Sequence, residues 1–377
     1  MAEGERWDAI VVGGGPGGST AAWRLARGGA RVLVLDAARF PRVKLCAGWV
    51  TPAVWRTLEV DPAAYPHTIQ PFSRATIELE GEVHETAWPT TASYGIVRKE
   101  FDDFLLRRAA SAGAQVRDGM RVQAIERLGE GFAVSAGGER FVAPIVIGAG
   151  GHHCPVARAL GDVSEEETVV VARESETRLG AALLGELTER SGTPELFAEP
   201  DFRGYGWYFT KGDFLNVGVG CVGGGANLQR RCEAMVQRLR DDGRLPENVE
   251  IEPFKGHAYA LRLRAPRRIA GERFVLVGDA AGLARGVSGE GIGPAVESGA
   301  LAADLALRAR DGSRFEDAVA RPYAQAIEAR FGSGREGIVG RLLDLVPHGW
   351  IEAAARLVCR TPYLRRRFVF EGAFGMN

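Results

Sequence analysis

The sequence predicts a mixed α/β fold, α+β overall, with a parallel-sheet domain, an inserted antiparallel β-sheet domain and a C-terminal helical segment. Two observations predict it. A β-α-β pattern occupies the first 36 residues, and strand-like segments recur between residues 76 and 220, away from that unit. We expect a discontinuous first domain (1–72, 95–160 and 265–330), an inserted domain (73–94 and 161–264) and a helical cap (331–377).

The N-terminal unit consists of a buried strand at 8–12, a helix at 16–27 and a second strand at 31–35. The turn between strand and helix reads Gly13-Gly-Gly15-Pro16-Gly17-Gly18, a G-x-G-x-x-G motif. Such glycines permit a tight turn, close approach to phosphate and close helix packing, while the helix N-terminus faces the anion. Asp36 follows the second strand, where a ribose-binding carboxylate is expected. The unit predicts a Rossmann-like domain.

A second apolar strand ends in Gly278-Asp279, about 260 residues after the first motif. The two motifs together narrow the ligand from any dinucleotide to FAD. We expect a helix to begin near Gly291, Ile292 and Gly293, with free backbone amides that face the flavin.

The remaining segments divide between the two sheets. Residues 98–109 carry apolar side chains on one helical face, and residues 121–142 alternate as in a three-strand meander before a buried strand at 144–148. The inserted sheet should contain strands at 76–80, 168–174, 204–210 and 214–220. This inserted sheet is the candidate substrate platform.

Composition excludes several classes of protein. A net charge of -1 over 377 residues gives no electrostatic case for nucleic acid as a partner. The five cysteines are odd in number and form no C-x-x-C pair, which disfavours disulfides, zinc and iron-sulfur clusters, so no metal is expected. No signal peptide or membrane-spanning run is visible, and we expect a cytoplasmic protein.

Two segments carry a resemblance to a known family. They are Lys44-Leu-Cys46-Ala47-Gly48 and Tyr205-Gly-Trp207-Tyr-Phe209-Thr210 with the downstream Gly218-Val-Gly220. They resemble the Lys-x-Cys-Gly-Gly and Tyr-x-Trp-x-Phe-Pro segments of the geranylgeranyl reductase family. That family lies within the glutathione-reductase-type flavoproteins, alongside aromatic hydroxylases and flavin-dependent halogenases. The chain departs from the family pattern at Ala47, Thr210 and Gly150.

The resemblance implies roles for residues of this chain. Cys46 becomes the candidate catalytic residue beside the isoalloxazine, as a proton donor or a gate, although a lone cysteine can also be a small buried hydrophobe. The substrate residues are Tyr205, Trp207, Phe209, Gly218 and Gly220; packing of aromatic strand residues in a core is the alternative. The expected cofactor-binding residues are Gly13, Gly15, Pro16, Gly17, Gly18, Asp36, Ala37, Lys44, Arg98, Val122, Gly148, Ala149, Gly150, Gly278, Asp279, Gly289, Gly291, Ile292 and Gly293.

The predicted activity is FAD-dependent reduction of carbon-carbon double bonds in an isoprenoid or similar apolar substrate, by hydride transfer from reduced flavin. Gly282 supports reduction, because related hydroxylases commonly have histidine there. A monooxygenase, hydroxylase or halogenase acting on an aromatic or apolar substrate is one alternative. A quinone-linked electron-transfer flavoprotein is another.

The expected partners are an apolar small molecule and an external electron donor, either NAD(P)H or a reductase or ferredoxin. The tail adds apolar residues at 342–346 and Arg360, Arg365, Arg366 and Arg367, which suit peripheral contact with the inner face of a membrane. A helical cap with a solvated basic end is the simpler interpretation of the tail.

Overall fold

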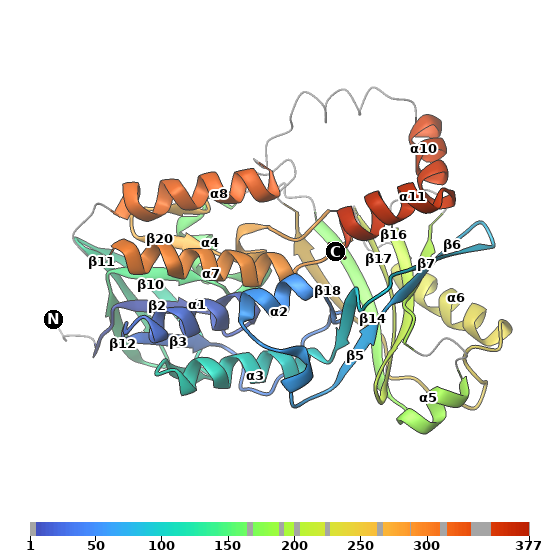
Figure 1. The fold of residues 1–377 in the computed structure, drawn as a ribbon. Helices are drawn as coiled ribbons and strands as arrows, with labels where there is room; N and C mark the ends of the chain where they lie inside the picture. Colours follow the sequence, from blue (N-terminus) through green and yellow to red (C-terminus); the bar gives the residue numbers. More distant parts are fainter. Residues whose placement is uncertain are drawn as a thin grey trace.

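The computed structural model describes residues 5–163, 169–187, 192–199, 204–222, 227–261, 267–286, 288–309, 315–332 and 348–376. The predicted apolar run at 342–346 lies outside these residues. Two sheet-based bodies lie side by side, and the C-terminal helices α10 and α11 lie above the second body (Figure 1). The mixed α/β architecture predicted from the sequence is confirmed.

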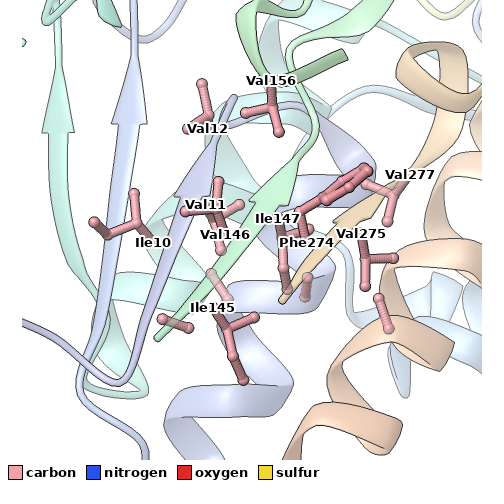
Figure 2. Packing of buried hydrophobic residues seen from close by; sticks show 14 of the residues in the cluster. Ile10, Val11, Val12, Ile145, Val146, Ile147, Val156, Phe274, Val275 and Val277 are labelled. Atoms are coloured by element: carbon pink, nitrogen blue, oxygen red, sulfur yellow. The ribbon is translucent and has the colours of Figure 1, made fainter. Parts of the chain in front are cut away.

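The N-terminal unit belongs to a six-stranded sheet with the order β19-β20-β13-β2-β3-β9. Its strands are β2 (Ala9–Val12), β3 (Val32–Asp36), β9 (Gln115–Asp118), β13 (Ile145–Gly148), β19 (Ala270–Gly271) and β20 (Phe274–Leu276). All neighbours are parallel except β19 and β20. The apolar runs of β2, β13 and β20 are buried, because a parallel sheet is covered on both faces (Figure 2).

Three helices pack side by side over this sheet, with α1 (Pro16–Arg27) between α3 (Arg98–Ser111) and α7 (Ile292–Arg308) (Figure 1). The crossing of α1 and α7 is close, since a Cβ on Gly299 would lie 2.2 Å from the Gly17 carbonyl oxygen. Further helices of this body are α2 (Pro52–Leu58), α4 (Pro155–Leu160) and α8 (Arg321–Phe331). Short 3-10 helices lie at Pro62–Ala64, Gly151–His153 and Gly278–Ala281, and a π-helix at Glu316–Ala320.

Two smaller sheets flank the parallel one. The predicted meander forms a four-stranded sheet with β1 (Glu5–Arg6), β10 (Val122–Leu128), β11 (Gly131–Ala136) and β12 (Glu139–Ala143). A three-stranded sheet of β4 (Trp49–Val50), β5 (Ile69–Phe72) and β8 (Ser93–Ile96) was not predicted. Its strands are too short and too far apart in the sequence to give a periodic signal.

The second body is a seven-stranded sheet with the order β18-β14-β17-β16-β15-β6-β7. Its strands are β6 (Arg74–Leu79), β7 (Glu82–Ala87), β14 (Val169–Arg178), β15 (Glu195–Ala198), β16 (Gly204–Lys211), β17 (Phe214–Val222) and β18 (Lys255–Ala260). The prediction of an antiparallel sheet needs one correction, because β15 pairs with β6 in parallel. Helices α5 (Ala181–Leu187) and α6 (Leu228–Asp241) belong to the same body, and α6 packs on one face of the sheet.

The C-terminal segment contains α10 (His348–Arg360), α11 (Pro362–Leu364) and the π-helix η6 (Arg365–Ala373). Arg365 is buried and fastens η6 to β7, donating to Thr86 Oγ1 at 2.9 Å and to the Glu85 carbonyl at 2.8 Å. This C-terminal segment packs on the face of the large sheet that α6 leaves free, through Phe370, Phe374 and Met376. We call α10, α11, η6 and the residues that follow them to Met376 the roof.

Candidate active site

A cavity of about 530 Å³ lies between the large sheet and the roof. Because side chains alternate along strands, one face of β14, β16, β17 and β18 supplies its walls. The sheet residues that line it include Val170, Ala172, Glu174, Tyr205, Trp207, Phe209, Gly220, His257 and Tyr259. Most of these side chains are apolar or aromatic, so the cavity suits an elongated apolar molecule.

The roof and the loop before α7 close this cavity from above. Val358, Phe368 and Phe374 line it from the roof. Ser288 Oγ donates to the Ala373 carbonyl oxygen at 2.6 Å, and the Tyr205 hydroxyl donates to the Ser288 carbonyl. Sheet, loop and roof are therefore fastened to one another at the cavity.

A second cavity of about 310 Å³ follows the carboxyl ends of the parallel strands. At its base Gly15 precedes the first turn of α1, and no side chain among the described residues caps the helix start. A Cβ on Gly15 would meet only the Arg42 guanidinium, at 3.6 Å, so the glycine leaves open space beside free amides and a cation. These features fit the pyrophosphate of a dinucleotide.

Asp36 lines the same cavity and is fixed by two backbone amides. Gly14 N donates to Asp36 Oδ2 at 2.7 Å and Ala38 N donates to Asp36 Oδ1 at 2.8 Å. The carboxylate thereby ties the glycine-rich turn to the end of β3, at the position expected for a ribose contact.

The two cavities meet at one border. The residues that line both are Cys46, His257, Tyr259, Gly289, Gly291 and Ile292. A dinucleotide in the second cavity would present its distal end at this border, and an apolar molecule in the first cavity would meet it there. Cys46 is the only cysteine among these shared residues.

Cys46 lies in a polar environment at the border. Gly48 N donates to Cys46 Sγ at 3.4 Å, and the buried Arg98 guanidinium is a hydrogen-bond partner of the same sulfur. Asp102 holds Arg98 in place through two hydrogen bonds of 2.7 and 2.8 Å. Burial alone would lower the pKa of Arg98, but Asp102 and Cys46 together hold it above its ordinary value. The guanidinium is therefore a permanent cation beside the thiol.

Ala47, a departure from the family pattern, is accommodated by this local backbone. Lys211 Nζ donates to the Ala47 carbonyl oxygen at 3.0 Å. Gly48 is the position that requires glycine, since its φ is +71° and a Cβ would lie 2.0 Å from the Ile96 carbonyl oxygen.

The structure divides the predicted cofactor residues into two groups. Those that line the second cavity are Gly15, Pro16, Gly17, Asp36, Lys44, Arg98, Ala149, Gly150, Gly278, Asp279, Gly289, Gly291 and Ile292. Those that do not line it are Gly13, Gly18, Ala37, Val122, Gly148 and Gly293. Gly13 and Gly18 instead pack the motif together, because a Cβ on Gly18 would lie 1.9 Å from the Gly13 carbonyl oxygen.

The helix start at Gly291–Gly293 corrects the expectation of free amides. Gly293 N donates to Glu290 Oε1 at 2.6 Å, so this amide is already paired. Glu290 is held in turn by Arg285, whose Nε donates to Glu290 Oε2 at 2.9 Å. Gly291 and Ile292 still face the border between the cavities.

The predicted substrate residues also separate by position. Tyr205, Trp207, Phe209 and Gly220 line the apolar cavity, whereas Gly218 lies beneath the Trp207 indole. A Cβ on Gly218 would lie 2.2 Å from that ring, so the glycine gives the indole its place. Trp207 Nε1 donates to Asn216 Oδ1 at 2.6 Å, which fixes the ring orientation.

Sequence reasoning missed three polar residues that line the apolar cavity, Glu174, His257 and Tyr259, and the buried Lys211 beside the Cys46 segment. Burial, with Lys44 and Arg98 nearby, lowers the pKa of His257 to about 4, and burial raises the pKa of Tyr259. Both side chains are therefore neutral at pH 7. A signal existed for Glu174, since charged residues at inward positions of a buried strand are uncommon.

The cysteines and the metal-binding potential complete the site description. Cys154, Cys221, Cys232 and Cys359 are buried and reduced, and burial raises the pKa of Cys232 to about 11. Over the part of the chain that the structure describes, no group of three or more His, Cys, Asp and Glu side chains could hold a metal ion. Within those same residues, no helix is both long and apolar enough to cross a bilayer.

Comparison with known proteins gives the following relatives. The family model described as FAD binding domain matches residues 6–314. The menaquinone reductase of Mycolicibacterium smegmatis is 32% identical over 80% of this chain and 76% of its own length. The chloroplastic geranylgeranyl diphosphate reductase of Oryza sativa subsp. japonica is 29% identical over 86% of this chain and 72% of its own length.

A solved structure shares the whole fold. The crystal structure of a geranylgeranyl bacteriochlorophyll reductase-like protein from Thermoplasma acidophilum matches with a TM-score of 0.80. The two chains are 20% identical, and the match covers 98% of this chain and 97% of the other.

Proposed function

Because the chain belongs to the FAD-binding domain family, we propose that it is an FAD-dependent reductase that saturates carbon-carbon double bonds of an isoprenoid or similarly apolar substrate. The observation that carries the proposal is the border at which the cofactor cavity meets the apolar cavity beside Cys46. The names of the relatives given above agree with it. We propose that electrons come from an external donor, either NAD(P)H or a reductase or ferredoxin.

Reduced FAD, when bound, supplies the hydride. Residues of the chain supply the rest: free amides at Gly15 hold the pyrophosphate, and Trp207 and Phe209 provide apolar contact along the substrate. Cys46, at the border of the two cavities, would give a proton to the second carbon, and Arg98 would stabilise the thiolate left behind.

The test uses anaerobic, dithionite-reduced enzyme with geranylgeranyl compounds as the substrate. We expect products whose mass rises by about two for each double bond reduced, because a hydride and a proton add together. Oxidised enzyme without a donor is the control and should give no such product. In a separate aerobic assay, rapid oxygen consumption with a hydroxylated product would instead assign the protein to the oxygenases.

We further propose that the roof touches a membrane surface. Its helices expose large apolar side chains at Trp350, Leu357, Tyr363 and Phe368. Arg366 and Arg367 are exposed on the same helices and complement anionic lipids. Phe368 also lines the apolar cavity, so a bound lipid surface would lie next to the substrate route.

Co-sedimentation with phosphatidylglycerol vesicles tests the membrane contact at low and high salt. We expect binding that weakens with salt and that falls when both Arg366 and Arg367 are changed to Gln. The matched control changes two exposed arginines outside the roof, Arg121 and Arg230, to Gln. Equal binding of both double variants would contradict the proposal.

A further inference from the structure

Three ionisable side chains lie together behind Cys46: Glu174 and Glu176 on β14, and Lys211 on β16. Glu174 is 2% exposed and Lys211 is 0% exposed. Their contacts reach two consecutive residues of the Cys46 segment. Cys46 N donates to Glu174 Oε1, and Lys211 Nζ donates both to Glu176 Oε2 and to the Ala47 carbonyl oxygen.

The charges of this cluster balance only when it holds one extra proton. With both carboxylates ionised, one ammonium would face two negative charges, and the charge on Glu174 would be buried, which is unfavourable. Glu176 has Lys211 as its direct partner. Glu174 Oε2 is buried and, among the described residues, has no hydrogen-bond partner, so Glu174 is the carboxyl that favours the neutral form.

Some of the groups around Glu174 raise its pKa and others lower it. The pKa of Glu174 is raised to about 7, because burial and Glu176 raise it by more than Lys211, the Cys46 amide and Arg98 lower it. On β18, His257 faces the same cavity and is neutral at pH 7. Glu174 therefore changes charge in the neutral pH range.

We propose that Glu174 is a positioning residue that holds a proton and gives it to the Cys46 thiolate after each turnover. This proposal rests on the proposed reductase function. Once the Cys46 thiol has given its proton to the substrate carbon, the O–H bond of Glu174 breaks and a new S–H bond forms. The negative charge moves from sulfur to carboxylate, and the carboxylate then takes a proton from water.

The covalent geometry allows this exchange. Three bonds separate Cys46 N from Sγ, so the sulfur lies within about 6 Å of the Glu174 oxygen that accepts from this amide. A single cavity water can bridge such a gap. Arg98, in contact with the sulfur, stabilises the thiolate until the proton arrives.

The test measures alkylation of Cys46 by iodoacetamide in FAD-free protein between about pH 5.5 and 9.5, with peptide mass spectrometry as readout. Cys46 is the half-exposed cysteine, so its peptide reports the site. We expect the wild-type rate to rise in two steps, with a break near pH 7 where Glu174 ionises. A Glu174→Gln variant should lose the break and react about fivefold faster at pH 8, because the nearby negative charge is gone.

Glu195→Gln is the matched control, since Glu195 is also a buried strand carboxylate but is paired with Arg244. It should leave the profile unchanged. A single-step profile in the wild type, which needs no variant to fold, overturns the proposal; so does a Glu174→Gln profile that superimposes on the wild type.

Turnover measurements separate this proposal from the proposed function. In reduced holoenzyme, Glu174→Gln should lower kcat about tenfold with KM unchanged and remove the pH limb near 7. If no isoprenoid is reduced, the proposed function fails, while the alkylation profile still decides whether Glu174 and Cys46 are coupled.

Discussion

The two cavities are built in different ways, although they share a border. The cofactor cavity uses backbone: glycines after β2, at the start of α1 and after β20 lie at the carboxyl ends of parallel strands and at the amino end of the helix that follows β2. The substrate cavity uses side chains on one face of a sheet whose strands come from residues 74–87 and 169–260. Backbone sites depend on local turns, whereas side-chain sites depend on the register between distant strands.

The largest expected effect breaks the backbone-built cavity. Gly13→Val should abolish FAD binding and destabilise the fold by about 3 kcal/mol or more, because the residue has a φ of +112° and its Cβ would lie 2.3 Å from the Ala149 carbonyl oxygen. Flavin absorbance after purification and thermal unfolding measure it. Gly138→Ala, also at positive φ but with open space around it, is the control and should retain FAD.

A change at the border should separate chemistry from cofactor binding. Cys46→Ser should lower turnover about a hundredfold while leaving FAD content unchanged, because a hydroxyl is a much weaker acid than a thiol. Cys221→Ser is the matched control, since Cys221 lines the same cavity away from the cofactor. Unchanged turnover in Cys46→Ser would remove this thiol from the mechanism.

Low pH should lower the free energy of unfolding through protonation of His257, a residue at the border. Its pKa is lowered from 6.5 to about 4 in the folded protein, so the stability it contributes is present above pH 6.5 and is lost as pH falls toward 4. The free energy of unfolding falls by about 3 kcal/mol at most from this residue. Urea unfolding at pH 7 and pH 4.5 should show a smaller pH dependence for His257→Gln than for the wild type, and equal dependence would contradict the assignment.

The smallest effect concerns the wall of the side-chain cavity. Gly220 lines it, and a Cβ there has ordinary contacts of 3.6 Å, so Gly220→Leu should fold and bind FAD normally. KM for a long isoprenoid should rise about tenfold, with a smaller rise for a short one, because leucine fills part of the cavity. Equal KM values would place the substrate elsewhere.

Prediction from the sequence succeeded where the signal was local. The helix at 16–27 and the meander at 121–142 were located correctly, because glycine turns and alternation mark their limits. The small sheet of β4, β5 and β8 and the parallel pair of β15 and β6 left no such mark. Their pairing depends on contacts between distant segments, which periodicity does not encode.

The candidate site follows the same division. Cys46 and Trp207 could be named from short segments, and both line the apolar cavity. Lys211 could not, and Glu174 stood out only as a charged residue within a strand, since one carboxylate and one lysine on separate strands carry no motif. Pairing of β14 with β17 and of β17 with β16 places them behind the Cys46 segment.

By itself the sequence determined the cofactor and the half of the molecule that binds it, because dinucleotide binding uses glycines and helix amides a few residues apart. Only the tertiary structure decided what lies across the border from the cofactor cavity. The roof, the apolar wall and the buried carboxylate come from segments far apart in the chain, and strand register and packing bring them to Cys46.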